Sequence, residues 1–220
     1  MGSSIRFGFC ACFFLGSGFG WFPRGLGCFL VSETVRAFIA VDIEDPRVIA
    51  RLVAIRDAFV ATGAPMKPVE DQNLHITIRF LGNIPLSLAD DIRGVIEAAR
   101  PRRVVIRLRG VGAFPSTRNP RVIWVGVAEG AEELTRIYRE IEAGLRRLGF
   151  RPEREEFVPH VTLARIKGRR NIERVVKLLH ELAEEEIGEI VLEAVRLKQS
   201  ILTRSGPIYK TLREVRAVEA

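Results

Sequence analysis

Two spacings of hydrophobic residues divide the 220-residue chain into strands and helices from Arg36 onward. Apolar residues at every second position predict strands, because successive side chains of a strand point to opposite faces. The predicted strands are Arg36–Ile43, Pro65–Val69, Leu74–Leu81, Val104–Phe114, Val122–Val127, Val158–Ile166, Ile190–Ile201 and Tyr209–Val215, the last two joined as a hairpin through Ser205-Gly206-Pro207. A spacing of roughly 3.6 residues predicts helices. The predicted helices are Asp45–Thr62, Ser87–Arg100, Ala131–Leu148 and Ile172–Glu185.

The order of these elements indicates an α+β fold, because the helices are interleaved among the strands. Leu74–Leu81 and Val158–Ile166 occupy comparable places, one in each half of the body. Duplication of a β–α unit would produce this arrangement. We therefore expect a bilobal protein of two similar lobes, each with an antiparallel-type sheet that faces a central cleft and with helices on the outside.

The two comparable strands carry the same four-residue phrase. It reads His75-Ile76-Thr77-Ile78 in the first and His160-Val161-Thr162-Leu163 in the second, and these are two of only three histidines in the chain. The second and fourth residues are apolar, so they predict the buried face of each strand. His and Thr then project together from the opposite face. If the fold places the strands side by side, one cleft receives two imidazoles and two hydroxyls.

Such a set suits displacement at phosphorus. Imidazole titrates near neutrality, so one His can serve as acid while the other serves as base, and each Thr hydroxyl can hydrogen-bond a phosphate oxygen. Metal binding is the competing use of His, but two His without a carboxylate or Cys in a recognisable spacing make a poor zinc site. We expect no metal and no other cofactor. The third histidine, His180, lies in a charged helix and is expected on the surface.

Net charge and cysteine content indicate which partners and which cellular compartment to expect. The formal net charge of +7 favours polyanionic partners such as RNA, although a solvated basic surface is the alternative. Scarce Asn and Gln beside abundant Arg and Glu are typical of a thermophile. Cys10, Cys12 and Cys28 all lie in the first thirty residues, which excludes a disulfide framework for the body of the protein. We expect a cytoplasmic protein with no membrane association and no obligatory protein partner.

Residues 1–34 differ in composition from the remainder. They are rich in Phe and Gly, and their apolar run is too short and too interrupted for a membrane-spanning helix. We expect this segment to be disordered or to precede the true start of the protein, with a leader or a genuine extension as alternatives. The strand that opens at Val35 then begins a two-lobed domain of residues 35–220.

The two motifs and their flanks resemble a known family. The paired His-x-Thr-x phrases are similar to those of the two-histidine phosphoesterase superfamily. Three longer segments resemble its RNA 2′,3′-cyclic phosphodiesterase family, also called LigT-like 2′-5′ RNA ligases. They are Arg36-Ala-Phe-Ile-Ala-Val-Asp42, His75-Ile-Thr-Ile-Arg-Phe-Leu-Gly82 and Pro159-His160-Val-Thr-Leu-Ala-Arg165. The resemblance extends from Val35 to the C-terminus.

This resemblance implies metal-independent hydrolysis of an RNA-terminal 2′,3′-cyclic phosphate, for example on a tRNA fragment, to a 2′-phosphomonoester. In that assignment His75 is the proton donor, His160 is the proton acceptor, and Thr77 and Thr162 bind the phosphate. The symmetry of the sequence does not distinguish donor from acceptor. Three alternatives stay open: 2′-5′ ligation by the same groups, a phosphodiesterase for small cyclic phosphates, and a non-catalytic RNA-binding module.

Other residues are candidates for substrate binding. Alternation places Arg79 on the face of His75, whereas it places Arg165 opposite His160 unless the strand bends or ends there. Phe114 or Tyr209 could stack on a terminal base, although aromatic residues at strand ends often belong to the core. The turn Pro115–Arg121 is basic, and its Arg118 and Arg121 could contact the RNA backbone.

Overall fold

The computed structural model describes residues 33–204 and 206–219. Its strands are β1 (Thr34–Asp42), β2 (Met66–Pro68), β3 (His75–Pro85), β4 (Val105–Phe114), β5 (Val122–Glu129), β6 (His160–Ile166), β7 (Glu186–Val191), β8 (Ala194–Leu202) and β9 (Pro207–Arg216). Its α-helices are α1 (Pro46–Ala61), α2 (Ala89–Ala98), α3 (Ala131–Arg147) and α4 (Ile172–Glu181). Two short 3₁₀ turns, η1 (Asp71–Asn73) and η2 (Leu86–Leu88), flank β3.

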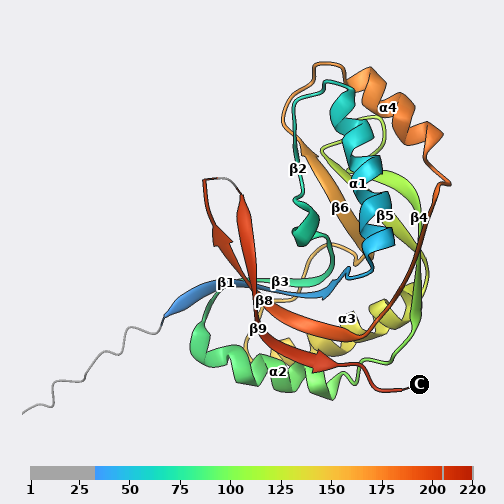
Figure 1. Cartoon of the computed structure of the whole chain (residues 1–220). Helices are drawn as coiled ribbons and strands as arrows, with labels where there is room; N and C mark the ends of the chain where they lie inside the picture. The colour runs from blue at the N-terminus through green and yellow to red at the C-terminus, as the bar shows by residue number, and fades with distance from the viewer. Residues whose placement is uncertain (1–32, 205, 220) are drawn as a thin grey trace, which may run out of the picture. The chain divides into compact units, whose positions relative to one another are not determined.

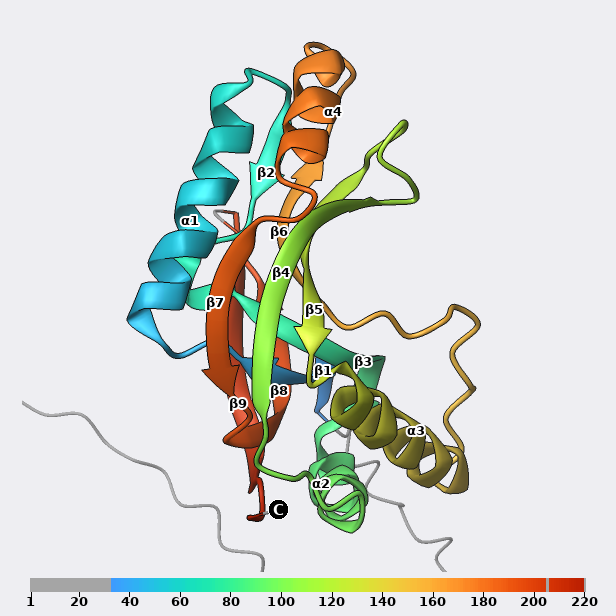
Figure 2. The ribbon, with the colours of Figure 1, turned by 90° about the vertical axis from the view of Figure 1, so that its right-hand side faces the viewer.

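The strands form one hydrogen-bonded sheet in the order β7-β4-β5-β6-β3-β1-β8-β9, with β2 added beside β6. All pairings between these named strands are antiparallel, as we expected. The two halves of the sheet meet where β3 pairs with β6, and only Ile76 and Val161 pair there. The strands of the two halves cross steeply at this junction (Figures 1 and 2). This crossing separates the sheet into the two expected lobes.

Each lobe draws elements from both halves of the chain. Helices α1 and α4 lie beside the half made of β2 and β4–β7, whereas α2 and α3 lie beside the half that contains β3, β1, β8 and β9 (Figure 1). The first helix begins as its sequence predicts, because the carboxylate of Asp45 accepts hydrogen bonds from the backbone N–H groups of Arg47 and Val48. Its buried residues Leu52, Ile55 and Phe59 follow the helical spacing.

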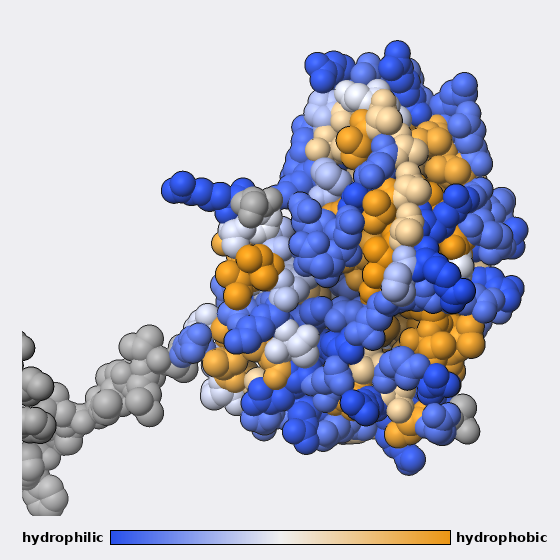
Figure 3. Space-filling view, in the orientation of Figure 1, coloured by the Kyte–Doolittle hydropathy of each residue, from blue (hydrophilic) through white to orange (hydrophobic). Residues whose placement is uncertain are grey.

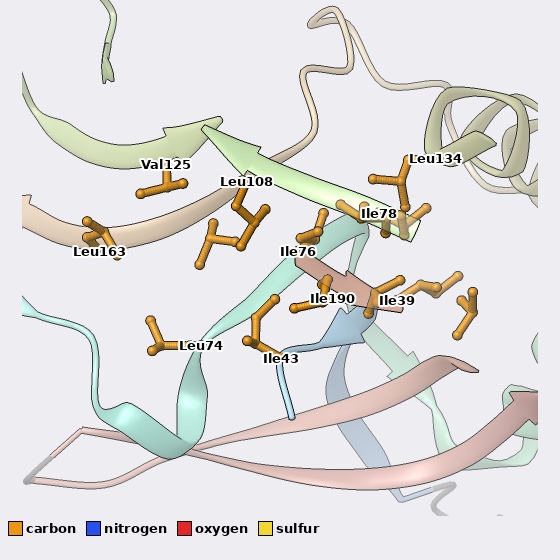
Figure 4. Packing of buried hydrophobic residues seen from close by; sticks show 14 of the residues in the cluster. Ile39, Ile43, Leu74, Ile76, Ile78, Leu108, Val125, Leu134, Leu163 and Ile190 are labelled. Atoms are coloured by element: carbon orange, nitrogen blue, oxygen red, sulfur yellow. The ribbon is translucent and has the colours of Figure 1, made fainter. Parts of the chain in front are cut away.

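The core lies behind the two histidine-bearing strands. Ile76, Val161 and Leu163 are fully buried, and Ile78 is nearly so. Figure 4 shows Ile76 and Ile78 in one cluster with core residues of the neighbouring elements. Burial of these four side chains fixes the face of each strand that points inward, because a one-residue slip would expose them.

Several boundaries differ from the sequence prediction, and three of the differences amount to more than one or two residues. The predicted strand Ile190–Ile201 is two strands that break at Leu192-Glu193: β7 pairs with β4, while β8 crosses to the other lobe. No turn residue marks this break, and only the strand pairing imposes it. Helix α4 ends at Glu181 rather than Glu185. Strand β3 continues to Pro85 because Gly82, with φ 72°, is accommodated inside its pairing with β1.

The start of the sheet also differs by two residues. Thr34 pairs with Pro85, and the backbone oxygen of Glu33 accepts a hydrogen bond from Leu86. Residues 33 and 34 therefore belong to the folded domain and not to the N-terminal segment. Our expectations for residues 1–32 lie outside the described residues.

Candidate active site

The junction of the two lobes brings the four predicted site residues together. Because Ile76 and Val161 pair and point into the core, their neighbours point to the opposite face of the sheet. His75, Thr77, His160 and Thr162 are all partly exposed on that face. The antiparallel register about the central pair places the His of each strand nearest the Thr of the other.

Both imidazoles are oriented by the same local hydrogen bond. The Nδ1 atom of His75 lies 2.6 Å from the backbone oxygen of Asn73, and that of His160 lies 2.6 Å from the backbone oxygen of Val158. A carbonyl oxygen only accepts, so each Nδ1 carries a proton and donates it. Each Nε2 is then left for proton exchange. In His75, Nε2 also lies 3.0 Å from the hydroxyl of Thr77.

Burial lowers the pKa of both imidazoles below 6.5. For His75, burial is the largest cause, and the positive charge of Lys198 also lowers the pKa. For His160, burial again dominates and Arg165 adds to it. The hydrogen bonds to Asn73 and Val158 oppose these effects without cancelling them. The free protein therefore holds both rings predominantly neutral at neutral pH.

Aromatic side chains support both rings. The His75 ring lies 5.1 Å from the ring of Phe38 and 5.3 Å from that of Tyr209. The His160 ring lies 5.0 Å from the ring of Phe114 and 6.0 Å from that of Trp124. Phe114 thus packs against a histidine and does not line the cavity described next, whereas Tyr209 does.

A cavity of about 520 Å³ opens beside these residues. Its walls include His75, Thr77, Thr162 and Arg165, whereas His160 lies next to it through Thr162 rather than in its lining. Small-molecule sites range from roughly 300 to 1,000 Å³, so one nucleotide is of suitable size. The hairpin of β8 and β9 forms one wall, and its exposed apolar residues appear as a patch in Figure 3.

A bulge after each Thr decides which following residue faces the cavity. In β3 the register with β1 skips Ile78, and in β6 the register with β5 skips Leu163. The alternation of side chains therefore reverses in both strands. Arg79 turns into the protein and does not reach the cleft, so our expectation for this residue is wrong. Arg165 turns toward the cavity, because the strand bends there.

The same bulge exposes Phe80, which we did not predict. Phe80 is 53% exposed and lines the cavity. It stands five residues after His75, as Arg165 stands five residues after His160. Alignment of the segment after His75 with the segment after His160 places Phe80 at the position of Arg165. Phe80 could therefore have been identified from the sequence once Arg165 was a candidate.

Sequence comparison identifies the family. A family model described as LigT like Phosphoesterase matches residues 42–124 and again residues 125–209, so each match contains one His-x-Thr strand. The chain belongs to the LigT-like phosphoesterase family. A relative from Aeropyrum pernix is 53% identical over 172 residues, which cover 78% of this chain and 98% of the relative. Another, from Methanothermobacter thermautotrophicus, is 37% identical over 179 residues, covering 80% and 95%. Both are named RNA 2′,3′-cyclic phosphodiesterase.

Solved structures confirm the two-lobed α+β fold of this LigT-like phosphoesterase. A Thermus thermophilus protein aligns with a TM-score of 0.68 and 29% identity, over 82% of this chain and 97% of that one. Escherichia coli LigT complexed with 3′-AMP aligns with a TM-score of 0.69 and 21% identity, over 84% and 99%. The second similarity is one of fold alone.

In this LigT-like phosphoesterase, ion pairs and hydrogen bonds hold the side chain of Arg79 inside the protein. This side chain is 9% exposed, and its guanidinium forms ion pairs with the carboxylates of Glu142 in α3 and Glu153. It also donates hydrogen bonds to the backbone oxygens of Phe80 and Arg151. Arg79 thereby ties the bulged end of β3 to α3 and to the segment that leads into β6.

Two further residues near His75 were missed by sequence reasoning. Asn73 is 6% exposed, and its side-chain amide donates a 2.8 Å hydrogen bond to the backbone oxygen of Pro207, which links His75 to the β8–β9 hairpin. Lys198 is 7% exposed, and its ammonium lies 2.6 Å from both carboxylate oxygens of Asp42. No linear pattern marks Lys198, because its partner lies on another strand.

The described part of the chain contains neither a membrane-spanning helix nor a cluster of metal ligands. Within residues 33–204 and 206–219, no helix is long and apolar enough to cross a membrane. In the same part of the chain, no group of three or more His, Cys, Asp or Glu side chains is placed to hold a metal ion. His180 is exposed on α4, as we expected.

Proposed function

We propose that this LigT-like phosphoesterase hydrolyses an RNA-terminal 2′,3′-cyclic phosphate to a 2′-phosphomonoester, with two histidines as acid and base and no metal. The observation that carries the proposal is the pair of adjacent His-x-Thr strands. Both present an imidazole Nε2 and a hydroxyl on one face. The relatives from Aeropyrum pernix and Methanothermobacter thermautotrophicus, named RNA 2′,3′-cyclic phosphodiesterase, support the same reaction.

In the proposed reaction, the Nε2 of His160 accepts a proton from water as the water oxygen attacks phosphorus. The bond from phosphorus to the 3′ oxygen breaks, and protonated His75 donates its Nε2 proton to that oxygen. The 2′ oxygen keeps the phosphate. The hydroxyls of Thr77 and Thr162 donate hydrogen bonds to the nonbridging oxygens. This choice of donor and acceptor follows the resemblance to the family.

Substrate binding favours protonation of His75, which takes up the proton from solvent. Burial keeps this imidazole neutral in the free protein. A bound cyclic phosphate adds a negative charge within a few ångströms, and a nearby opposite charge favours the protonated form of a histidine. The substrate thus raises the pKa of His75 and prepares the acid. Exclusion of water from the cavity by the bound substrate strengthens the attraction between the phosphate and the imidazolium of His75.

The walls of the cavity favour a nucleotide as substrate. Arg36 and Arg165 line it, and neither forms an ion pair within the described part of the chain. Arg196 and Lys198 of the same sheet are, by contrast, paired with Asp42. Unpaired arginines suit phosphate, because the guanidinium donates two parallel hydrogen bonds. The exposed ring of Phe80 provides a surface on which a base can stack.

The test is an assay of the purified protein in EDTA with an RNA oligonucleotide that ends in a 2′,3′-cyclic phosphate. We expect the product to gain one water and to be a 2′-phosphate, measured by mass spectrometry and by ³¹P NMR. His75→Ala and His160→Ala should each lower kcat by about 10² to 10⁴. His180→Ala is the matched control, because this histidine is exposed on α4 and should leave turnover unchanged.

Three results would contradict the proposal. They are an intact cyclic phosphate, near wild-type turnover in either histidine variant, and a rate that disappears with EDTA and returns with a divalent metal. Addition of an RNA with a 5′-hydroxyl end to the same reaction measures joining separately from hydrolysis. Binding that persists without any turnover would favour the non-catalytic RNA-binding module.

A further inference from the structure

The imidazole of His160 lies against two aromatic side chains of neighbouring strands. Its ring centre is 5.0 Å from that of Phe114 in β4 and 6.0 Å from that of Trp124 in β5. Strands β4, β5 and β6 are adjacent in the sheet (Figure 1). Trp124 is the cross-strand partner of Thr162, so its side chain shares the face of the sheet that carries the active site. Neither ring lines the cavity, so both are placed to act on the histidine and not on a bound nucleotide.

Two glycines make room for the indole of Trp124. Gly112 is the cross-strand partner of Trp124 in β4, and a Cβ atom on it would overlap the indole atoms Cη2 and Cζ2. A Cβ atom on Gly126 would crowd the indole atom Cζ3 at 3.3 Å. Gly126 is the cross-strand partner of His160. The indole therefore extends along β5 from the position beside Thr162 to the position beside His160.

The indole also destabilises the fold locally. Its Nε1–H group is buried, and within the described residues it has no hydrogen-bond acceptor. A buried donor without an acceptor is unfavourable, because the group has given up its hydrogen bonds to water. A phenylalanine would fill much of the same space without this penalty. The presence of tryptophan therefore points to a property that an indole has to a greater degree than a benzene ring.

That property is the attraction of an aromatic face for a cation. Tryptophan is the strongest of the aromatic side chains in cation–π interactions, which act within about 6 Å of the ring centre. In the proposed reaction His160 accepts a proton and becomes an imidazolium next to Trp124. Burial disfavours this charge and lowers the pKa of the histidine, and Arg165 on the same strand adds to the effect. The residues of β4 and β5 that face it, Phe114, Trp124 and Gly126, carry no charge. Beyond the backbone hydrogen bond at its Nδ1, the aromatic rings are therefore the groups that stabilise the imidazolium.

We propose that Trp124 is a positioning residue for His160: its indole holds the imidazole with Nε2 toward the cleft and stabilises the imidazolium that forms as the proton of water is accepted. This inference rests on the proposed function and adds to it the group that acts on the proton acceptor. The proton returns to solvent after the 2′-phosphomonoester leaves. Because Trp124 acts through His160 and not on the substrate, its loss lowers kcat and leaves KM nearly unchanged.

The first test measures steady-state kinetics on an RNA 2′,3′-cyclic phosphate end. Trp124→Leu should lower kcat roughly 3- to 30-fold, which corresponds to the usual strength of a cation–π contact. Trp124→Phe should lie between this variant and wild type, because it keeps a smaller aromatic face. Tyr138→Leu is the matched control: Tyr138 of α3 stacks on Phe157 with ring centres 4.5 Å apart, and it contacts no histidine ring among the described residues. It should leave kcat and KM unchanged. Thermal melting establishes that each variant is folded.

The second readout is the acid limb of kcat/KM against pH, which reports the protonation of His160 in the free protein. Loss of the cation–π contact destabilises the imidazolium, so Trp124→Leu should move this limb to lower pH by roughly 0.4 to 1.5 units. The alkaline limb, which belongs to His75, should stay in place. His75 across the junction and Arg165 are the charged or titratable neighbours of His160, and neither changes in this variant. A loss of packing alone would not move one limb selectively.

Fluorescence provides a readout that needs neither turnover nor a change at residue 124. The chain has two tryptophans, so Trp21→Phe leaves Trp124 as its only indole. An imidazolium beside an indole quenches the indole fluorescence more strongly than a neutral imidazole does. The emission should therefore fall as the pH is lowered through the pKa of His160. His160→Gln should abolish this fall, and His75→Gln should retain it. Circular dichroism at each pH establishes that the protein stays folded.

Each contrary outcome is distinct. An unchanged kcat in folded Trp124→Leu would overturn the inference, and so would an acid limb that moves to higher pH, because the indole would then act by excluding water. A loss of kcat/KM that comes entirely from KM would overturn it as well, since Trp124 would then bind the substrate. Emission that does not respond to protonation of His160 would overturn the contact itself. If Trp124→Leu does not fold, Trp124→Phe and the fluorescence titration decide. Wild-type protein that hydrolyses no cyclic phosphate would overturn the proposed function, and the fluorescence titration would still test the contact.

Discussion

Replacement of Arg79 by Met should destabilise the protein strongly. The change leaves the Glu142 carboxylate, which is 9% exposed, without its cation, and it removes donors from the backbone oxygens of Phe80 and Arg151. Loss of one partner of a buried ion pair costs about 3–5 kcal/mol, because the remaining charge is uncompensated. We expect a decrease of this size in the free energy of unfolding, measured by denaturant titration with an unchanged m-value.

A matched control and a second variant test the reasoning. Arg213→Met removes an equally well-formed pair with Asp90, but Asp90 is 70% exposed, so the loss in the free energy of unfolding should be far smaller. Arg79→Met combined with Glu142→Leu removes both charges and should recover most of the stability, because apolar replacement of a whole buried pair is often neutral. A loss under about 1 kcal/mol in Arg79→Met, or a double variant no more stable than the single one, would refute the argument.

Two further predictions concern the proposed reaction. Burial lowers the pKa of His75 and His160 below 6.5 in the free protein. A plot of kcat/KM against pH should therefore be bell-shaped, with both of its apparent pKa values below 6.5. The value of kcat/KM falls at higher pH because the proton donor His75 loses its proton. It falls at lower pH because the proton acceptor His160 becomes protonated. An optimum above pH 7.5 would contradict the assignment. Phe80→Ala should raise KM for an RNA end about 5- to 150-fold, since stacking contributes roughly 1–3 kcal/mol per base, whereas Phe80→Trp should retain binding. An unchanged KM in Phe80→Ala would place the base elsewhere.

Local patterns were sufficient for much of the fold. Asp45 and Pro46 predict the start of α1, and the observed helix begins at Pro46 with Asp45 as its N-cap. The alternation in His75–Ile78 and His160–Leu163 predicts the buried and exposed faces of both strands, and the structure has those faces. These predictions succeed because capping, proline geometry and two-residue alternation depend on only a few consecutive residues.

The residues that follow the motifs could not be assigned in this way. Arg79 and Arg165 exchange their predicted sides because a bulge follows each Thr. A bulge depends on the register with the neighbouring strand, which is remote in sequence. The same cause hides the break between β7 and β8, since those strands find partners at different places in the sheet.

The sequence by itself determined which four side chains share a face on β3 and β6, because alternation along a strand is a local property. Only the tertiary structure decided that these faces adjoin, through the single pair Ile76 and Val161. It also decided that Lys198 meets Asp42 near His75 and that Lys67 lies opposite Arg165. Such contacts join residues far apart in the chain, so packing and strand register select them, and no local pattern records that choice.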